Sequence, residues 1–313
     1  MANQKTLTHV IPDLIIKNPD NPRVIFREEE LDALMRSIEQ VGIQVPLSVY
    51  EKNKKYVLID GERRWRCSLK LGLKEVPVII EPQPSALNNL LMMFNIHNVR
   101  VQWDLLALAY KIDKVRKLVK KEQNVSLSKK ELADLTGVNT ATIGRCDELL
   151  TLPKKYLDII WKELEKPKGE QKYTEDLFIE IKKGIKTIEV YLPEIILEYT
   201  PEELLDTFFR KYETGVENNM VRFRNLSKIA RGEIVGIQRG KIIKTIKKYI
   251  TQPNYTIEQA FQDSVADAYS ERTTERKLYD LLEILKDTIN LEGHEELRNV
   301  LVELKGQINR LIK

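Results

Sequence analysis

Hydrophobic residues follow two rhythms over about the first hundred positions of the chain. Short runs of valine, isoleucine and leucine predict β-strands, and apolar residues three and four positions apart predict amphipathic helices. In residues 27–41, for example, Leu31, Leu34 and Ile38 share one face, and Gly42 is expected to end the helix. The predicted strands are residues 7–16, 47–51, 56–60 and 76–80, and the predicted helices are residues 27–41, 62–72 and 85–100. Because strands and helices interleave, this region is expected to form a small α/β or α+β domain.

The strand-to-helix junction at residues 57–67, VLIDGERRWRC, carries the most distinctive chemistry of the chain. The apolar strand ends at Asp60-Gly61, and Arg63, Arg64 and Arg66 follow within a few positions. A helix that begins here has backbone N–H groups without helical partners, and its dipole favours anions. Arginine side chains match phosphate oxygens with planar forks. The junction therefore predicts an anion site, although the same pattern is also compatible with a solvated helix whose arginines face water.

Residues 128–149 have the spacing of a helix-turn-helix. Ala133 is small, Gly137 lies four residues later, and Ile143 lies six residues beyond the glycine. This spacing allows two helices to cross closely, turn at the glycine and anchor the second helix in a core. An ordinary helical hairpin is the alternative. The second helix would present residue types suited to base edges and phosphates, namely Asn139, Thr140, Thr142 and Arg145.

A basic window at residues 222–248 contains nine lysines and arginines against one acid, Glu233. It follows a charged stretch, residues 154–172, that is expected to be a linker or surface loop, and a helical stretch, residues 174–212. Apolar residues interleave with the basic ones, so the window predicts folded helices with one basic face. The residues expected to contact the DNA backbone are Arg222, Arg224, Lys244, Lys247 and Lys248. A merely solubilising surface is the alternative.

The last segment has leucine and isoleucine at steps of four and three residues on either side of Gly293. This rhythm suits a helical hairpin that pairs in a homodimer. Packing of the hairpin onto the preceding helices of the same chain is the alternative. The chain is thus expected to comprise four parts: residues 1–100, 101–165, 166–265 and 266–313.

Composition limits the class of protein. The chain has 313 residues, of which 42% are hydrophobic and 31% are charged, and its net charge is +4. No apolar run reaches the ~18 residues that span a bilayer, so a cytoplasmic protein without a membrane partner is expected. Cys67 and Cys146 lack metal-ligand spacing and are expected to be reduced, structural thiols. The local basic excess favours nucleic acid as the partner.

Several motifs in one order resemble the N-terminal domain of the ParB/RepB/Spo0J partition proteins. They are NPDNPR at residues 18–23, SIEQVGIQVPL at residues 37–47 and LIDGERRWRCSLKLGLKEVPVII at residues 58–80. The resemblance implies an α+β domain similar to sulfiredoxin, followed by an all-α helix-turn-helix module and a helical C-terminal region. It also implies CTP binding by the GERR arginines, closure of a dimeric clamp on double-stranded DNA, dimerisation through the C-terminal region, and a ParA-type ATPase as partner. The nucleotide-site residues carried over by position are Gly61, Glu62, Arg63, Arg64 and Arg66. Further candidates, in or near the family's other nucleotide motifs, are Gly42, Pro46, Asn95, Asn98 and Arg100.

The sequence departs from the family pattern in two motifs. Val45 stands where the family's GxxQP motif has glutamine, and Phe94 stands where its ENxxR motif has glutamate. In the second motif Asn95 is kept, and Asn98 replaces the arginine. In the family the glutamate and asparagine hold magnesium. Loss of the carboxylate therefore leaves Asn95 as a lone candidate ligand, and nucleotide binding is expected to be stronger than nucleotide hydrolysis.

The resulting expectation is a ParB-like DNA-binding protein for plasmid or chromosome partition, in which a CTP-type nucleotide gates DNA association. A transcriptional or plasmid-copy regulator with the same fold and no nucleotide turnover is the alternative. A nuclease of the same superfamily is a third class, but the sequence has no acidic cluster suited to metal-assisted cleavage.

Overall fold

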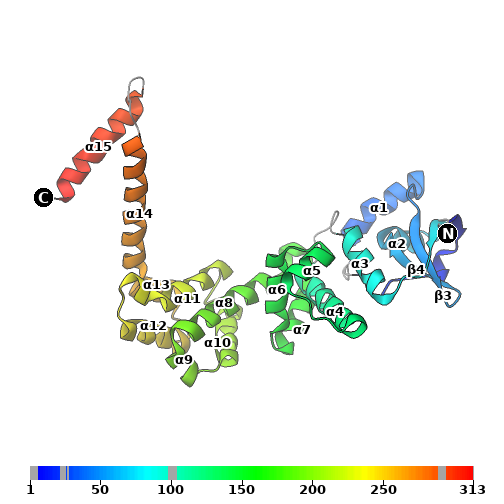
Figure 1. Ribbon diagram of the computed structural model, residues 1–313, viewed down its shortest axis with the longest axis horizontal. Helices are drawn as coiled ribbons and strands as arrows, with labels where there is room; N and C mark the ends of the chain where they lie inside the picture. The colour runs from blue at the N-terminus through cyan, green and yellow to red at the C-terminus, as the bar shows by residue number, and fades with distance from the viewer. Residues whose placement is uncertain (1–5, 22–25, 27, 98–103, 288–293, 313) are drawn as a thin grey trace. The chain divides into compact units, whose positions relative to one another are not determined.

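Figure 1 shows the computed structural model of the chain, which describes residues 6–21, 26, 28–97, 104–287 and 294–312. The chain divides into two compact units, residues 1–182 and residues 183–313. The first unit begins with a small mixed sheet, and the remainder of the described chain is helical. The predicted fold class, an α+β domain followed by helical modules, is therefore confirmed.

Five strands form one sheet in the order β1-β5-β3-β4-β2. The strands β3 and β4 form an antiparallel hairpin that turns at Asn53 and Lys54, both with positive φ, whereas β3 and β5 run parallel. The first predicted strand, residues 7–16, is broken by a 3-10 turn at Pro12–Leu14, because proline favours the first position of a helical turn. The strands are β1 (Thr6–Val10), β2 (Ile15–Ile16), β3 (Leu47–Lys52), β4 (Lys55–Asp60) and β5 (Val76–Glu81).

Three helices accompany the sheet: α1 (Glu28–Val41), α2 (Glu62–Lys70) and α3 (Ala86–His97). The apolar face predicted for α1 is buried, because Leu31 and Ile38 pack against Cys67 of α2. Cys67 is fully buried, and burial raises the pKa of its thiol, which agrees with a structural role. On the other side of α2, the indole N–H of Trp65 donates to the carbonyl of Pro12 at 2.9 Å and fixes the helix against the start of the chain.

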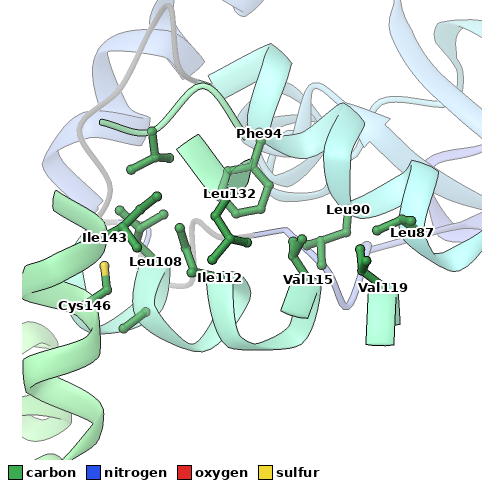
Figure 2. Close-up of a cluster of buried hydrophobic side chains, with 12 residues drawn as sticks. Leu87, Leu90, Phe94, Leu108, Ile112, Val115, Val119, Leu132, Ile143 and Cys146 are labelled. Atoms are coloured by element: carbon green, nitrogen blue, oxygen red, sulfur yellow. The ribbon is translucent and has the colours of Figure 1, made fainter. Parts of the chain in front are cut away.

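The helix-turn-helix is formed by α5 (Lys129–Thr136) and α6 (Thr140–Leu150), and α4 (Leu105–Gln123) packs beside both. Ser128 and Glu131 form a reciprocal capping box at the start of α5, and Gly137 ends it with φ +71°. Figure 2 shows the shared core, in which Phe94 of α3 joins the helices of this module. Burial raises the pKa of the Cys146 thiol in this core to about 12, so this cysteine too is an inert structural thiol.

The expectation of a linker at residues 154–172 is wrong for most of that stretch. Residues 154–164 form helix α7 (Lys154–Leu164), which buries Tyr156, Leu157 and Ile160. These residues recur at helical spacing, and Trp161 of the same helix stacks on Tyr110 of α4 with ring centroids 6.1 Å apart. The high charge of the segment lies on the other positions of the helix, so composition alone suggested a loop. Only the short 3-10 turn Lys168–Glu170 and its flanks form the predicted loop before α8 (Glu175–Tyr191).

The second unit is a compact helical domain followed by two long helices. Its core contains Phe208, Phe223 and Tyr249, which are all fully buried. Helix α10 begins with a capping box formed by Thr200 and Glu203, and Pro201 takes the first helical position. The helices are α9 (Pro193–Glu198), α10 (Pro201–Glu213), α11 (Arg224–Ala230), α12 (Arg239–Thr251) and α13 (Ile257–Ser264), with 3-10 turns at Met220–Phe223 and Gly232–Val235.

The C-terminal segment forms two helices, α14 (Ala266–Asp287) and α15 (Glu295–Leu311). Helix α15 has no buried residue. Leu278 and Leu282 of α14 are 51% and 47% exposed, and Leu297 of α15 is 44% exposed. These leucines of α14 and α15 therefore do not pack onto the preceding helices, which was the alternative to pairing in a homodimer. Within the described ranges, no helix combines the length and the apolar character needed to cross a bilayer.

Candidate nucleotide site and DNA-binding surface

The predicted anion site lies where β4 meets α2. Gly61 lies at this junction with φ +102°, a conformation that side-chain-bearing residues rarely adopt. A Cβ at Gly61 would lie 3.0 Å from Cγ of Leu47, a buried residue of β3. Because Gly61 offers no side chain to cap α2, the first turn of the helix keeps the backbone donors that favour an anion.

Arg64 links this helix to the loop that follows α1. Its Nη1 atom donates to the carbonyl of Pro46 at 3.0 Å and to the carbonyl of Val45. Its Nη2 atom lies 3.3 Å from the carboxylate of Asp60. The structure therefore brings together Pro46 and the arginine motif, two candidates that are 18 residues apart in sequence. Gly42 ends α1 with φ +72°, four residues before Pro46.

Arg66 is paired within the motif. Its Nε and Nη2 atoms donate to Oε1 of Glu62 at 2.9 and 2.6 Å, and its guanidinium lies 4.1 Å from the ring centre of Phe26. Glu62 is only 7% exposed and also accepts a hydrogen bond from Asn21 at 2.6 Å. A phosphate that binds at this point must therefore compete with Glu62 for Arg66, just as it must compete with Asp60 for Arg64. Sequence reasoning missed the roles of Asn21 and Asp60, although both lie within motifs that it identified.

The remaining nucleotide candidates are spread more widely. Arg63 is half-buried on α2, and Asn95 is exposed on α3. Asn98 and Arg100 lie outside the described residues. Phe94, which stands where the family has glutamate, is fully buried in the core shown in Figure 2. The described residues include no group of three or more His, Cys, Asp or Glu side chains that could hold a metal ion.

The second helix of the helix-turn-helix, α6, carries the predicted DNA-reading residues. Asn139 caps this helix, because its Oδ1 accepts a hydrogen bond from the backbone N–H of Thr142 at 2.8 Å. Thr140 is exposed and Thr142 is half-buried. Fully buried Ile143 anchors the helix as predicted, which leaves Thr140 on the accessible side.

Arg145 faces a cleft of about 610 Å³ beside α6. The opposite wall of this cleft comes from the loop after α7 and the start of α8, and Arg145 forms an ion pair there with Asp176. Glu175 lines the same wall, and burial raises the pKa of its carboxyl group. Sequence reasoning placed Arg145 toward DNA, and in the free protein its guanidinium is held by a carboxylate that DNA would have to replace.

The basic window is not the uniform basic face that its sequence suggests. Lys247 pairs with Glu198 of α9, and Lys248 lies 3.3 Å from Asp263 of α13. Arg239 pairs with both Glu194 and Glu233. Most of these acids lie outside residues 222–248, so a charge count within that window could not reveal them.

The other predicted backbone contacts of the window vary in exposure. Arg222 is half-buried, whereas Arg224 and Lys244 are exposed. Lys244 forms no ion pair with the described residues. Contact of any of these side chains with DNA stays a prediction.

The fold and the candidate site define a class of protein: a small mixed sheet domain with a candidate anion site, joined to a helix-turn-helix module. Residues 1–96 match the family model of the ParB N-terminal domain. The chain is 38% identical over 110 residues to the probable chromosome-partitioning protein ParB of Campylobacter jejuni, covering 35% of this chain and 39% of the relative. It is 30% identical over 145 residues to the chromosome-partitioning protein ParB of Caulobacter vibrioides, covering 45% of each chain. The N-terminal domain of the chain, residues 1–96, therefore belongs to the ParB N-terminal domain family.

Among solved structures, the chain is similar to the C-terminally truncated chromosome-partitioning protein ParB of Caulobacter crescentus complexed with CTP-gamma-S. The two are 25% identical, the match covers 51% of this chain and 86% of the other, and the TM-score is 0.29. The chain spans less than half the length of the two curated relatives named above.

Proposed function

We propose that this chain is a ParB-type partition protein that binds double-stranded DNA, and that a CTP-type nucleotide at the β4–α2 junction gates its DNA association. The observation that carries the nucleotide part is the clamp of Arg64 on the carbonyls of Val45 and Pro46. This clamp joins two motif segments at an uncapped helix N-terminus. The two relatives named above are both chromosome-partitioning proteins, which supports partition as the process.

The residues at the junction fit a nucleotide triphosphate better than they fit a magnesium ion. Arg63, Arg64 and Arg66 all lie within the first five residues of α2, and arginines near a helix N-terminus suit phosphate oxygens. The position of the family's magnesium glutamate is taken by Phe94, whose side chain is fully buried in an apolar core. Asn95 alone supplies a neutral amide oxygen, a weak ligand for a hard cation. Nucleotide binding is therefore proposed as a switch with slow turnover or none.

The same observation favours the second candidate function, a transcriptional or plasmid-copy regulator of this fold. A regulator needs nucleotide-controlled or constitutive DNA binding but no turnover, and buried Phe94 is compatible with that. A ParA-type ATPase is the partner that distinguishes partition from regulation. Pull-down of such an ATPase by the intact chain would support partition, whereas specific promoter binding without any ATPase partner would support regulation.

The C-terminal helices are proposed to form a homodimer. Leu278 and Leu282 of α14 and Leu297 of α15 are about half exposed and recur on one stripe of each helix. A second copy of the chain would bury these stripes, since each leucine side chain contributes ~1.5–3 kcal/mol on full burial. A dimeric partner is also what a clamp on DNA requires.

A titration of the intact chain tests the nucleotide part. CTP, ATP and GTP are added separately, with and without magnesium, in a calorimeter, and phosphate release is followed in parallel. Saturable CTP binding with little phosphate release is expected. Rapid magnesium-dependent phosphate release would refute the proposal that Phe94, in place of glutamate, keeps nucleotide turnover slow. If no nucleotide binds, the proposed site itself is refuted.

A DNA-binding experiment tests the reading helix. Replacement of Thr142 and Arg145 by alanine is expected to abolish preference among DNA sequences, because the proposal assigns base contacts to these two side chains. Unchanged preference in the double variant would show that α6 does not read the sequence.

A further inference from the structure

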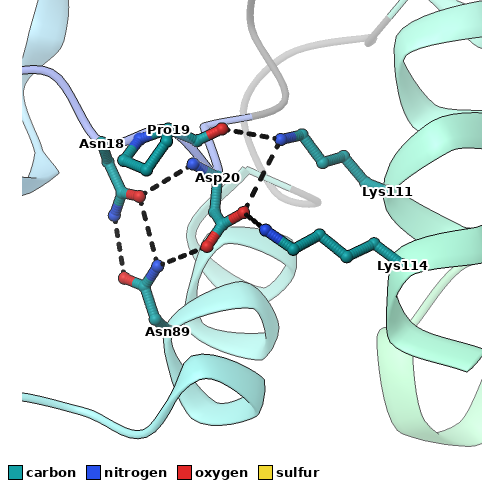
Figure 3. Close-up of polar contacts among 6 residues, drawn as sticks. All are labelled: Asn18, Pro19, Asp20, Asn89, Lys111 and Lys114. Carbon is teal, nitrogen blue, oxygen red and sulfur yellow. Dashed lines mark hydrogen bonds and ion pairs between the residues drawn. The ribbon is translucent and has the colours of Figure 1, made fainter. Parts of the chain in front are cut away.

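The loop at residues 18–21 lies between the sheet domain and the helix-turn-helix module and contacts both. Figure 3 shows its contacts with α3 and α4. Resting on the proposed nucleotide-gated function, we propose that Asp20 is a positioning residue that sets the helix-turn-helix module on the sheet domain and links its orientation to Glu62 of the nucleotide site.

A buried pair of amides fixes the loop on α3. The Nδ2 atom of Asn18 donates to Oδ1 of Asn89 at 2.8 Å, and Nδ2 of Asn89 donates back to Oδ1 of Asn18 at 3.2 Å. Asn18 and Asn89 are only 4% and 5% exposed. Asn89 Nδ2 also donates to Oδ2 of Asp20 at 3.1 Å. A buried amide that loses its hydrogen-bond partner costs free energy, so this network holds the Asp20 carboxylate in one orientation.

The other oxygen of Asp20 faces two lysines of α4. Lys114 forms an ion pair with Oδ1 of Asp20, and Nζ of Lys111 lies 3.8 Å from the same atom. Lys111 Nζ also donates to the carbonyl of Pro19 at 2.9 Å. The Asp20 side chain is 9% exposed, and burial lowers the pKa of Lys111 while Asp20 acts to raise it. One carboxylate that serves an amide and two ammonium groups is a buried, directional contact, unlike a surface ion pair.

Helix α4 passes this contact on to the DNA-reading helix. Its residues Leu108 and Ile112 share a core with Ile143 and Cys146 of α6. Arg116, just beyond Lys114 on α4, lies 2.6 Å from Asp147 of α6. The orientation of α4 therefore fixes the orientation of α6.

The same loop reaches the candidate nucleotide site on its other side. Asn21 follows Asp20 directly and donates to Oε2 of Glu62 at 2.6 Å, while Oε1 of Glu62 is held by Arg66. A phosphate that takes Arg66 away from Glu62 leaves the hydrogen bond from Asn21 in place on the other oxygen of Glu62. Because Asn21 and Asp20 are adjacent, a shift of Glu62 pulls directly on the contact with α4. This arrangement gives the nucleotide a physical route to the DNA-reading helix, with Asp20 as its middle element.

The test compares Asp20→Asn with Asp13→Asn in the intact chain. Asp13 is an exposed carboxylate in the 3-10 turn between β1 and β2. Spin labels are placed on cysteines introduced at Lys54, in the β3–β4 turn, and at Lys121, near the end of α4. Both natural thiols are buried, which directs labelling to the new cysteines. Double electron–electron resonance then measures the distribution of distances between the two spin labels, one on the sheet domain and one on α4.

The Asp20→Asn substitution is expected to broaden or shift this distribution, because two ammonium groups lose their carboxylate. The substitution is also expected to leave the CTP dissociation constant within about twofold of the value for the unsubstituted chain. The effect of CTP on DNA affinity is expected to fall by at least about fivefold, which is a typical coupling between sites. Asp20→Glu is expected to restore part of both effects. Should Asp20→Asn fail to fold, Lys114→Gln, a change at a side chain that is 45% exposed, tests the same contact.

A distance distribution and a CTP effect equal to those of Asp13→Asn would overturn the proposal. If the unsubstituted chain binds no nucleotide, the proposed nucleotide gating is refuted independently of the role of Asp20. The distance measurement still decides whether Asp20 positions the two domains, so the two failures are distinguishable.

Discussion

Gly61 offers a sharp test of the geometry at the nucleotide site. Gly61 and Gly72 both have positive φ, +102° and +62°, so alanine is strained at either position. At Gly72 nothing lies within 4 Å of an added Cβ, whereas at Gly61 the Cβ would lie 3.0 Å from Leu47 and 3.2 Å from Arg64. Gly72→Ala therefore isolates the backbone strain, and Gly61→Ala adds a clash with the core.

The two substitutions differ in their expected cost. Backbone strain in the left-handed region costs ~1–2 kcal/mol, and this applies to both glycines. Displacement of Leu47, which is fully buried, adds ~1–3 kcal/mol at Gly61 only. We therefore expect Gly61→Ala to lower the free energy of unfolding by ~2–5 kcal/mol and Gly72→Ala by ~1–2 kcal/mol.

The assay is urea unfolding of the intact chain, with hydrogen exchange of the β4–α2 peptides to locate the loss within the first unit. Gly61→Ala is also expected to weaken CTP binding, because Arg64 must move from the added methyl group. Equal stability losses for the two variants would refute the close approach of Leu47. A destabilised Gly61→Ala chain with unchanged CTP affinity would refute the placement of the nucleotide at this junction.

Three further predictions concern the DNA surface, the dimer and pH. Lys244→Gln is expected to reduce the slope of log affinity for DNA against log salt concentration by ~0.9, which corresponds to the loss of one phosphate contact. Lys247→Gln is expected to change the slope little, because Lys247 is already paired with Glu198. Equal slopes for the two variants would contradict this difference. Leu282→Asp is expected to convert a dimer to a monomer in light scattering, and an unchanged mass would remove α14 from the interface. Burial raises the pKa of Cys146 from 9.0 to about 12, so the unfolded chain releases this proton first and stability falls as pH rises from about 9 to about 12. The fall should be smaller in Cys146→Ala, and equal pH curves would show that this thiol does not titrate on unfolding.

Local patterns predicted the elements that surround the site because their signals lie close together in sequence. The β4–α2 junction follows from an apolar run, a glycine and a helix former, all within residues 57–67. The helix-turn-helix follows from the Ala133, Gly137 and Ile143 spacing, and its helices begin and end as that spacing requires. Cys67 and Cys146 are both buried free thiols, which agrees with the structural role expected of them.

Pairing between distant charges could not be predicted in this way. Glu194 and Glu198, which pair with Arg239 and Lys247, come from α9, more than forty residues earlier. The contacts of Asp20 with Lys111 and Lys114 join residues more than ninety positions apart. Such partners are set by how helices pack, and a sequence window contains only one side of each pair.

Phe94 shows how a departure from a family pattern acquires a physical meaning only in the folded chain. From sequence it marks a lost carboxylate. In the structure it fills a core shared by α3, α4 and α5, together with Leu90, Ile112 and Leu132. Phe94 thus contributes packing between the sheet domain and the helix-turn-helix module where the family pattern has a carboxylate.

The dependence of DNA affinity on CTP tests the central claim most directly. Fluorescence anisotropy measures the affinity of the intact chain for a duplex enriched by selection on this protein, with and without CTP. The same measurement uses the Arg63→Ala/Arg64→Ala variant and, as a control on the same helix, Lys70→Ala. CTP is expected to change the affinity of the unsubstituted chain and of Lys70→Ala by at least about fivefold, and to leave the double variant unchanged. Equal CTP effects in all three proteins, or none in any, would contradict a nucleotide switch at the β4–α2 junction.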